Sequence, residues 1–434
     1  MAAVRPPEGF YHRLWTPLIT LWYLIWQWLQ DNHTLEKVVS DARRGGADRL
    51  CQHKPLSQGL KSKKTPGFSN ARQRLPLDWV KECFAKITAA LLTLGTWRNP
   101  DLPVELLDGS TKRMRPYGTI PEEFPPHRTR AKKNYWCVAR VVVSFCAVTG
   151  IATVAQIASI HLSEQALAVQ MILERVQRVL YIGDRNFGVW RVIGAAFQRR
   201  SHALVRLTEK RVKRLLGQKQ LPAFTDKLVS WSPTAQDQID QGLLVQPVPG
   251  RVLIAKGQRR GFRPQTLYLF TTLTDRKAYP PTKLLELYGW RWRVELDYRT
   301  VKSSMEMDQS EAKSAQMVKK EFYAGLMAYN LVRGLMAMAA EQAGCQPAEL
   351  SFTKVHGLLA SVITELFMSC MSSPPRLSRL AWLLQEAAGA KLPTRTKPRP
   401  NEPRAQYYPP QVYPKMKGSR QEAREKLKNG TAKN

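Results

Sequence analysis

The order of apolar runs between residues 102 and 184 is the feature that most restricts the fold of this chain. A short apolar run, LPVELLD, predicts a strand that ends at Asp108. Two runs rich in β-branched residues follow at 136–150 and 151–160, and then comes a segment with helical spacing. A last apolar run, VLYIGD, predicts a strand that ends at Asp184. Strands and a helix in this order predict a mixed α/β core with both acids at strand ends.

A third acid, Glu295, lies on a predicted helix. The stretch 287–308 follows the helix-start sequence AYPPTK and contains one helix-weakening residue, Gly289. At about 100° per residue, four side chains fall within an arc of roughly 60°, and they are Tyr288, Arg291, Glu295 and Lys302. A neighbouring apolar sector is expected to be buried and consists of Leu287, Trp290, Val294, Val301 and Met305. A carboxylate among cations suits a phosphate-handling metal site. The alternative is a solvated face with an i,i+4 ion pair between Arg291 and Glu295.

Charge points to a polyanionic partner. The 434 residues include 67 Lys and Arg against 34 Asp and Glu, a formal net charge of +33. An excess of this size favours nucleic acid as the partner, and the alternative is a basic surface without a specialised role. The six cysteines include no Cys-x-x-Cys pair, which is typical of a protein in a reducing compartment. We therefore expect a cytoplasmic, nucleoid-associated protein.

One apolar segment, residues 14–30, raises the alternative of a membrane anchor or signal peptide. It is shorter than the ~20 residues that a membrane-spanning helix needs. It also contains Pro17 and Gln27 and lacks a small-residue cleavage site. We expect a core helix with buried tryptophans and no membrane partner.

Changes of composition divide the chain into four predicted parts. They are a helical N-terminal DNA-binding domain at 1–97, a catalytic core at 98–312, a helical C-terminal region at 313–390 and a basic, disordered tail at 391–434. A β-rich insertion is expected within the core at about 205–265. In the first part, a loop and the predicted helix start at Ser69 and Asn70 carry a cationic patch of Lys61, Lys63, Lys64, Arg72 and Arg74. This patch is either a DNA-binding surface or an ordinary solvated helix surface.

The three acids predict a metal-dependent chemistry if they converge. Three neighbouring carboxylates repel one another unless cations neutralise them, and hard oxygen ligands favour Mg²⁺ or Mn²⁺. Two such ions can activate a water or sugar hydroxyl and stabilise the leaving oxygen in a displacement at phosphorus. Flanking cations aimed at phosphate oxygens complete such a site. Helix geometry gives this position to Arg291, Lys302 and Arg299.

The spacing of Tyr288, Arg291, Glu295 and Lys302 resembles the Tyr-Arg-Glu-Lys signature of the insertion-sequence-four family of DDE transposases. The segment LLDGST resembles the family block with the first aspartate, and YIGDRNFG resembles the block with the second. The approach to the glutamate, TDRKAYPPTKLLELYGWRWRVE, and the segment FSNARQRLP are similar to further family regions. The resemblance covers roughly residues 10–340.

The resemblance implies an RNase H-like core interrupted by a β insertion before the glutamate helix. It implies that Asp108, Asp184 and Glu295 bind the metal ions, and that the DNA backbone at the transposon end is held by Tyr288, Arg291 and Lys302. Family members cut DNA at the ends of their element and join the 3′ hydroxyls to target DNA as a synaptic dimer. One departure is Asn186, where the family often has Gly; Asn tolerates a left-handed backbone, so we expect the turn to survive.

Two further functions remain open from the sequence. A non-catalytic DNA-binding protein could retain the fold, although the presence of all three acids argues against loss of activity. A metal-dependent nuclease without strand transfer would use the same acids.

Overall fold

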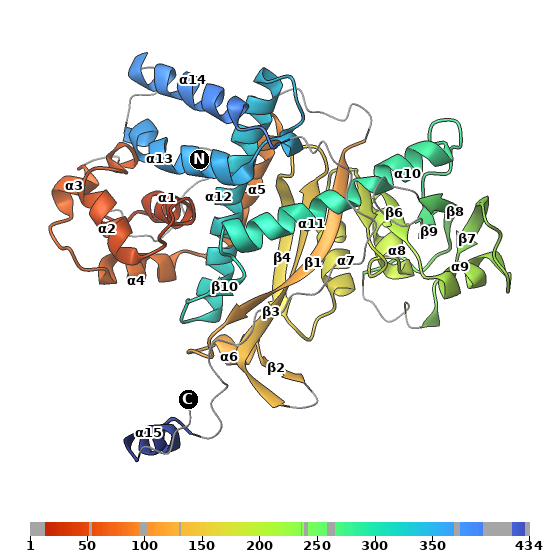
Figure 1. The fold of residues 1–434 in the computed structure, drawn as a ribbon, viewed down its shortest axis with the longest axis horizontal. Helices are drawn as coiled ribbons and strands as arrows, with labels where there is room; N and C mark the ends of the chain where they lie inside the picture. Colours follow the sequence, from red (N-terminus) through yellow and green to blue (C-terminus); the bar gives the residue numbers. More distant parts are fainter. Residues whose placement is uncertain are drawn as a thin grey trace. The chain divides into compact units, whose positions relative to one another are not determined.

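The computed structural model describes most of the chain (Figure 1). The described residues are 14–51, 54–94, 102–129, 132–235, 237, 242–257, 265–368, 374–393 and 419–429. One compact unit consists of Met1–Gly257 and Gln265–Thr394, and a second consists of Gln258–Pro264 and Arg395–Asn434. Within the second unit the described residues form helix α15, Arg420–Lys428. The predicted disorder of the tail falls mainly on residues outside the described ones.

The described strands form one ten-stranded sheet in the order β2-β3-β1-β5-β6-β9-β8-β7, with β10 beside β1 and β4 beside β3. Their bounds are β1 Val104–Met114, β2 Pro126–Thr129, β3 Lys132–Cys146, β4 Ala152–Ser159, β5 Leu180–Gly183, β6 His202–Arg206, β7 Thr225–Trp231, β8 Val248–Gly257, β9 Gln265–Thr271 and β10 Gln309–Ser310.

The centre of this sheet has the expected mixed α/β, RNase H-like arrangement. Strands β4, β3 and β1 are antiparallel neighbours, whereas β5 and β6 run parallel to β1. Helix α7 (Glu164–Glu174) connects β4 to β5, and α8 (Trp190–Gln198) connects β5 to β6. Parallel neighbours need such helical crossovers. The hydroxyl of Ser163 caps α7 by accepting a hydrogen bond from the backbone N–H of Ala166 at 3.1 Å.

One strand end differs from the prediction. Strand β1 does not stop at Asp108 but continues to Met114, because its polar second half pairs with β3 as far as Met114 and Cys137. The sequence shows where the apolar pattern stops, but backbone pairing with a long neighbour extends the strand further.

The predicted β-rich insertion is confirmed as an extension of the core sheet. Strand β9 pairs with β6, and β8 and β7 follow it outward. Its first cationic stretch forms helix α9 (Glu209–Leu216), with the Thr208 hydroxyl as N-cap.

Helices cover both faces of the sheet because strand side chains alternate. Leu106 and Val143 belong to a core shared with helices α5 and α12, whereas Leu107 and Val142 belong to a core shared with α7 and α8 (Figure 1). The other helices are α1 Pro17–Trp28, α2 Leu35–Arg43, α3 Leu56–Gly59, α4 Pro66–Arg74, α5 Leu77–Leu92, α6 Ile120–Glu123, α10 Pro281–Gly289, α11 Arg291–Arg299, α12 Ala315–Gln342, α13 Phe352–Met368 and α14 Pro374–Gly389. Short 3₁₀ turns occupy Asp48–Leu50 and Pro347–Glu349.

The apolar N-terminal segment forms α1, a buried helix whose tryptophans pack in the core as expected. None of the helices in the described ranges is long and apolar enough to cross a membrane. The predicted helix start at Ser69 and Asn70 is wrong, because α4 already begins at Pro66 and contains both residues. Proline is well suited to the first helical turn.

Candidate active site

Two of the predicted acids lie side by side at the edge of the parallel strands. Strand β1 pairs with β5 up to Leu106 and Ile182. Asp108 and Asp184 each stand two residues further along, so the same register makes them neighbours. Adjacent strands are separated by about 4.8 Å.

The environment of Asp108 disfavours its charge. Burial, together with the charges of Asp184 and Glu164, raises the pKa of this carboxyl to about 6. The backbone N–H of Gly109, which donates to Asp108 Oδ1 at 2.8 Å, and the Arg291 guanidinium act in the opposite direction. A cation beside this carboxylate would relieve that penalty.

The glutamate helix is confirmed in part. It begins earlier than predicted, with α10 at Pro281, continues as α11, and ends in a π-helical turn, Thr300–Ser304. The predicted apolar sector faces the core, with Val294 and Val301 buried. A π turn advances fewer degrees per residue than an α-helix. The side chain of Lys302 lies outside the described ones, so its place on the predicted 60° arc stays a prediction.

Helix α11 is attached to the sheet at the first aspartate. The phenol of Tyr298 donates a hydrogen bond to the backbone carbonyl of Asp108 at 2.9 Å. On the same helix, buried Asp297 forms an ion pair with buried Arg333 of α12. Glu295 lies one turn before Tyr298 and is therefore carried on a helix that contacts β1 at the aspartate itself.

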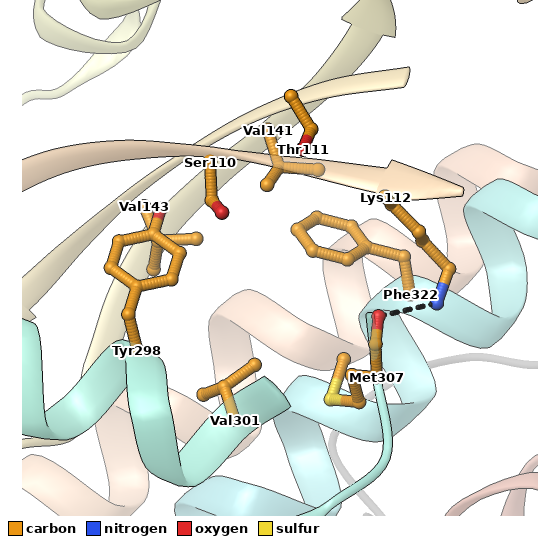
Figure 2. A pocket seen from close by; sticks show the side chains of 9 residues that line it. All are labelled: Ser110, Thr111, Lys112, Val141, Val143, Tyr298, Val301, Met307 and Phe322. Atoms are coloured by element: carbon orange, nitrogen blue, oxygen red, sulfur yellow. Dashed lines mark hydrogen bonds between the residues drawn. The ribbon is translucent and has the colours of Figure 1, made fainter. Parts of the chain in front are cut away.

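Lys112 of β1 forms hydrogen bonds with the segment that follows the π turn. Its ammonium group is buried and donates to the carbonyls of Met307 at 2.8 Å and Gln309 at 2.9 Å. A small, mainly apolar cavity lies between Lys112 and Tyr298, and Val301 of the π turn is among the side chains that line it (Figure 2).

Glu295 is paired with a neighbouring cation. The Arg291 guanidinium donates to Glu295 Oε1 at 2.6 Å, and the Glu295 side chain is 44% exposed. Burial opposes the charge of Arg291, but Glu295, Tyr288 and Asp184 together raise its pKa above the ordinary value. Arg291 thus interacts electrostatically with all three predicted acids. In the described parts of the chain, no three His, Cys, Asp or Glu side chains form a group placed to hold a metal ion.

Tyr288, predicted on the same helix arc as Arg291 and Glu295, has a different environment from these charged residues. Its side chain is buried, and burial raises the pKa of its phenol to about 12, whereas Arg291 and Arg206 lower it. Its hydroxyl has no hydrogen-bond partner among the described residues. Arg299, the remaining predicted DNA contact, is exposed on α11.

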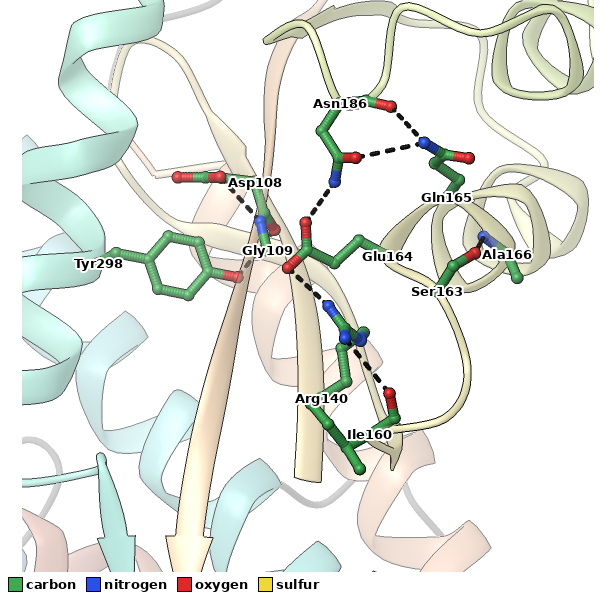
Figure 3. A network of polar contacts seen from close by, with 10 residues as sticks. All are labelled: Asp108, Gly109, Arg140, Ile160, Ser163, Glu164, Gln165, Ala166, Asn186 and Tyr298. Atoms are coloured by element: carbon green, nitrogen blue, oxygen red, sulfur yellow. Dashed lines mark hydrogen bonds and ion pairs between the residues drawn. The ribbon is translucent and has the colours of Figure 1, made fainter. Parts of the chain in front are cut away.

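Two polar residues beside the aspartates were missed from the sequence. Strand β6 pairs with β5 through Gly183 and Val205, so the next residue, Arg206, lies beside Asp184. Its Nε is buried without a hydrogen-bond partner in the described structure. Glu164, the first residue of α7, is the second, and it lies against Gly109 (Figure 3). A cation directly after the apolar run HALV was a signal for Arg206, but nothing local marked Glu164.

The donor chemistry suits a hard divalent cation. Asp108 and Asp184 offer carboxylate oxygens side by side, and desolvation already penalises the first of them. Oxygen donors of this kind are the ligands that Mg²⁺ and Mn²⁺ prefer. Glu295 adds a carboxylate on the helix that contacts Asp108, but among the described residues it does not form a three-carboxylate group with the two aspartates.

Comparison with known proteins gives consistent matches. A family model described as "Transposase DDE domain" matches residues 100–331, which are 232 of the 434 residues. A curated relative, "Transposase InsG for insertion sequence element IS4" of Escherichia coli, is 27% identical over 345 residues, covering 75% of this chain and 73% of the relative. A cryo-EM structure of a piggyBac transposase synaptic complex with hairpin DNA matches with a TM-score of 0.40 and 10% identity, over 91% of this chain and 80% of that chain. The family match includes Asp108, Asp184 and Glu295.

Proposed function

The chain belongs to the DDE-domain transposases and is of the insertion-sequence-four type, and on this premise we propose that it cleaves DNA at the ends of its insertion sequence and joins the 3′ hydroxyls to target DNA. The observation that carries the proposal is the register that makes Asp108 and Asp184 neighbours, under a helix attached to the Asp108 carbonyl. Neighbouring carboxylates that are partly shielded from water repel each other, and a positively charged ligand between them would relieve that cost.

Asp108, Asp184 and Glu295 are the catalytic residues of this proposal and would hold Mg²⁺, with Mn²⁺ as a substitute. When bound, a pair of such ions supplies an activated water or sugar hydroxyl and stabilises the leaving oxygen. Glu295 must exchange its Arg291 partner for this role. Its side chain is 44% exposed.

Arg291 is then free to bind DNA. Glu295 is half exposed, so a phosphate can replace it as the partner of Arg291. Tyr288, Lys302 and Arg299 are proposed as further contacts to the DNA backbone. Arg206 joins this set because its Nε and the Tyr288 hydroxyl are buried donors without partners in the described structure. Buried donors of this kind gain most from an anionic acceptor.

The proposed partners are the terminal repeats of the element, target DNA and a second copy of the chain in a synaptic dimer. The net charge of +33 supports a polyanionic partner.

The test is incubation of purified protein with its flanking DNA and Mg²⁺ or Mn²⁺, scoring cleaved and joined ends. Asp108→Ala, Asp184→Ala and Glu295→Ala should each abolish cleavage while DNA binding persists. Glu286→Ala is the matched control, because Glu286 is an exposed acid on α10. Full cleavage by any of the three variants would remove that residue from the site.

The same assay separates the two other functions. Cleaved ends without joined products would identify a metal-dependent nuclease. Specific DNA binding without any cleavage by the wild-type protein would identify a non-catalytic DNA-binding protein.

A further inference from the structure

Glu164, the first residue of α7, extends toward Gly109 of β1, the residue that follows Asp108 (Figure 3). Its carboxyl group lies against Gly109, and a Cβ at position 109 would collide with it. Glycine at position 109 therefore leaves room for the Glu164 carboxylate against strand β1, directly after Asp108. The Glu164 side chain is 20% exposed.

Both oxygens of this carboxylate are held. Arg140 of β3 donates to Oε1 at 3.0 Å, and the same guanidinium donates to the Ile160 carbonyl at 3.2 Å. The side-chain amide of Asn186 donates to Oε2. Charge-assisted hydrogen bonds of this kind are about twice as strong as neutral ones.

Asn186 connects Glu164 to the second aspartate. Its backbone N–H donates to Asp184 Oδ1 at 2.8 Å, which closes the turn after β5. Gln165 of α7 also donates to the Asn186 carbonyl at 2.9 Å. The turn expected at Asn186 is present, and it forms without a left-handed backbone, because in the described chain the non-glycine residues with positive φ are Arg200 and Glu306. Asn186 is therefore used here for its side chain.

We propose that Glu164 and Asn186 are a pair of positioning residues that hold Asp184 beside Asp108 for metal binding. The pair links the strand that carries Asp108 to the turn that carries Asp184. Asn186 is the residue at which this chain departs from the family pattern. A glycine at this position could not donate the side-chain hydrogen bond that Asn186 donates to Glu164. The inference rests on the proposed function, because the two residues are proposed to position a ligand of the same metal site.

The test measures binding of Mn²⁺ to the full chain by electron paramagnetic resonance, together with the Mg²⁺ concentration that half-saturates cleavage. Outer-shell partners of metal ligands are typically worth 10- to 100-fold in affinity. Glu164→Gln should weaken Mn²⁺ binding about tenfold, because the new amide opposes the Asn186 amide. Asn186→Asp should weaken it similarly, because two carboxylates then meet. Asn186→Ala, an exposed change with little risk to folding, should do the same.

The double variant Glu164→Gln with Asn186→Asp is the decisive one. It keeps the net charge and restores a donor and an acceptor across the pair, while the Gln oxygen still accepts from Arg140. Mn²⁺ affinity should return to within about threefold of wild type, as expected for directly coupled residues. Glu174→Gln, at the exposed far end of α7, removes the same charge as Glu164→Gln and should change nothing.

Additive losses in the double variant would overturn the inference, as would unchanged affinity in Glu164→Gln and Asn186→Ala. Asp184→Ala distinguishes this failure from failure of the proposed function. If Asp184→Ala loses Mn²⁺ binding while the Glu164 and Asn186 variants keep it, the metal site is supported and the proposed positioning role is refuted. If Asp184→Ala also binds Mn²⁺ normally, the metal site itself is refuted.

Discussion

Asp108 is a residue at which the proposed function and stability oppose each other. Burial and the neighbouring acids raise the pKa of its carboxyl to about 6, from an ordinary value of 3.8. Between these values the folded chain binds a proton that the unfolded chain does not. The cost of the charged form is thus absent below about pH 4 and fully present above about pH 6, so stability from this group falls as the pH rises.

Asp108→Asn should therefore stabilise the protein in EDTA near neutral pH. A shift of about two pKa units corresponds to at most about 3 kcal/mol, and partial exposure reduces this to roughly 1–2 kcal/mol. Urea unfolding at pH 7.5 and pH 4 measures it, with the gain expected at pH 7.5 and little difference at pH 4. An Asn variant that is less stable than wild type at pH 7.5 would contradict this account.

At this scale the sequence predicted the acids better than their surroundings. Asp108, Asp184 and Glu295 follow from local runs and spacing. The Glu164 contact with Gly109 and the burial of Tyr288 depend on how α7 and α10 pack, and no local pattern encodes this. Arg206 could have been found, because parallel strands in one register place their next residues side by side.

The glutamate helix is held in its rotation by a buried polar pair. Asp297 of α11 and Arg333 of α12 are both buried, and Arg333 Nε donates to the Tyr329 hydroxyl at 2.8 Å. That hydroxyl donates in turn to the Gly150 carbonyl at 2.8 Å. Because Asp297 is fixed toward α12, Glu295, two residues earlier, is directed away from it and outward.

Asp297→Asn should lower the free energy of unfolding by about 3 kcal/mol, because it leaves the Arg333 charge buried without a counter-ion. It should also reduce cleavage more than DNA binding, since the helix that carries Glu295 loses its anchor. Chemical denaturation and the cleavage assay measure the two effects. The exposed pair Arg379 and Glu365 offers the control: Glu365→Gln should cost less than about 1 kcal/mol. A loss of similar size in both variants would show that the buried pair has no special role.

The hydrophobic pattern of the sequence predicts helices and strands but not their boundaries where the backbone geometry changes. The helix over 287–308 was predicted from its helix-start sequence and the near absence of helix-weakening residues, and most of its predicted apolar sector is buried. Its π turn was not predictable, because the insertion of one residue per turn leaves no mark in a short sequence. The extension of β1 past Asp108 depends on pairing with β3, and a pairing partner distant in the sequence cannot be read from the local pattern.

The N-terminal helices and the C-terminal helices pack together within one compact unit. Trp26 donates to the Thr364 hydroxyl at 3.0 Å, and the rings of Trp22 and Phe367 stack with centroids 3.8 Å apart. Contacts over more than 300 residues leave no periodic trace in the sequence. The predicted domain boundaries at 97, 312 and 390 therefore stay predictions.

The exposed lysines of the N-terminal loop and the cations around Asp184 belong to this same unit, so we expect DNA to contact both. Each phosphate contact contributes about 0.9 to the slope of log affinity against log salt. Replacing Lys61, Lys63 and Lys64 by Gln should lower the slope by about 2–3, and Arg206→Gln by about 1. Fluorescence anisotropy with terminal DNA between about 50 and 200 mM salt measures both.

The matched control removes cations that already have acidic partners on their own helix. Lys86 pairs with Glu82 at 2.8 Å on α5, and Lys81 lies 3.9 Å from Asp78. Their replacement by Gln should leave the slope unchanged. If the α5 variant lowers the slope as much as the loop variant does, the effect comes from total positive charge and not from particular phosphate contacts. In that case DNA contact with the N-terminal loop is not supported. A slope lowered by the loop variant and by Arg206→Gln, and additive in their combination, would instead mark two separate phosphate contacts on one bound DNA.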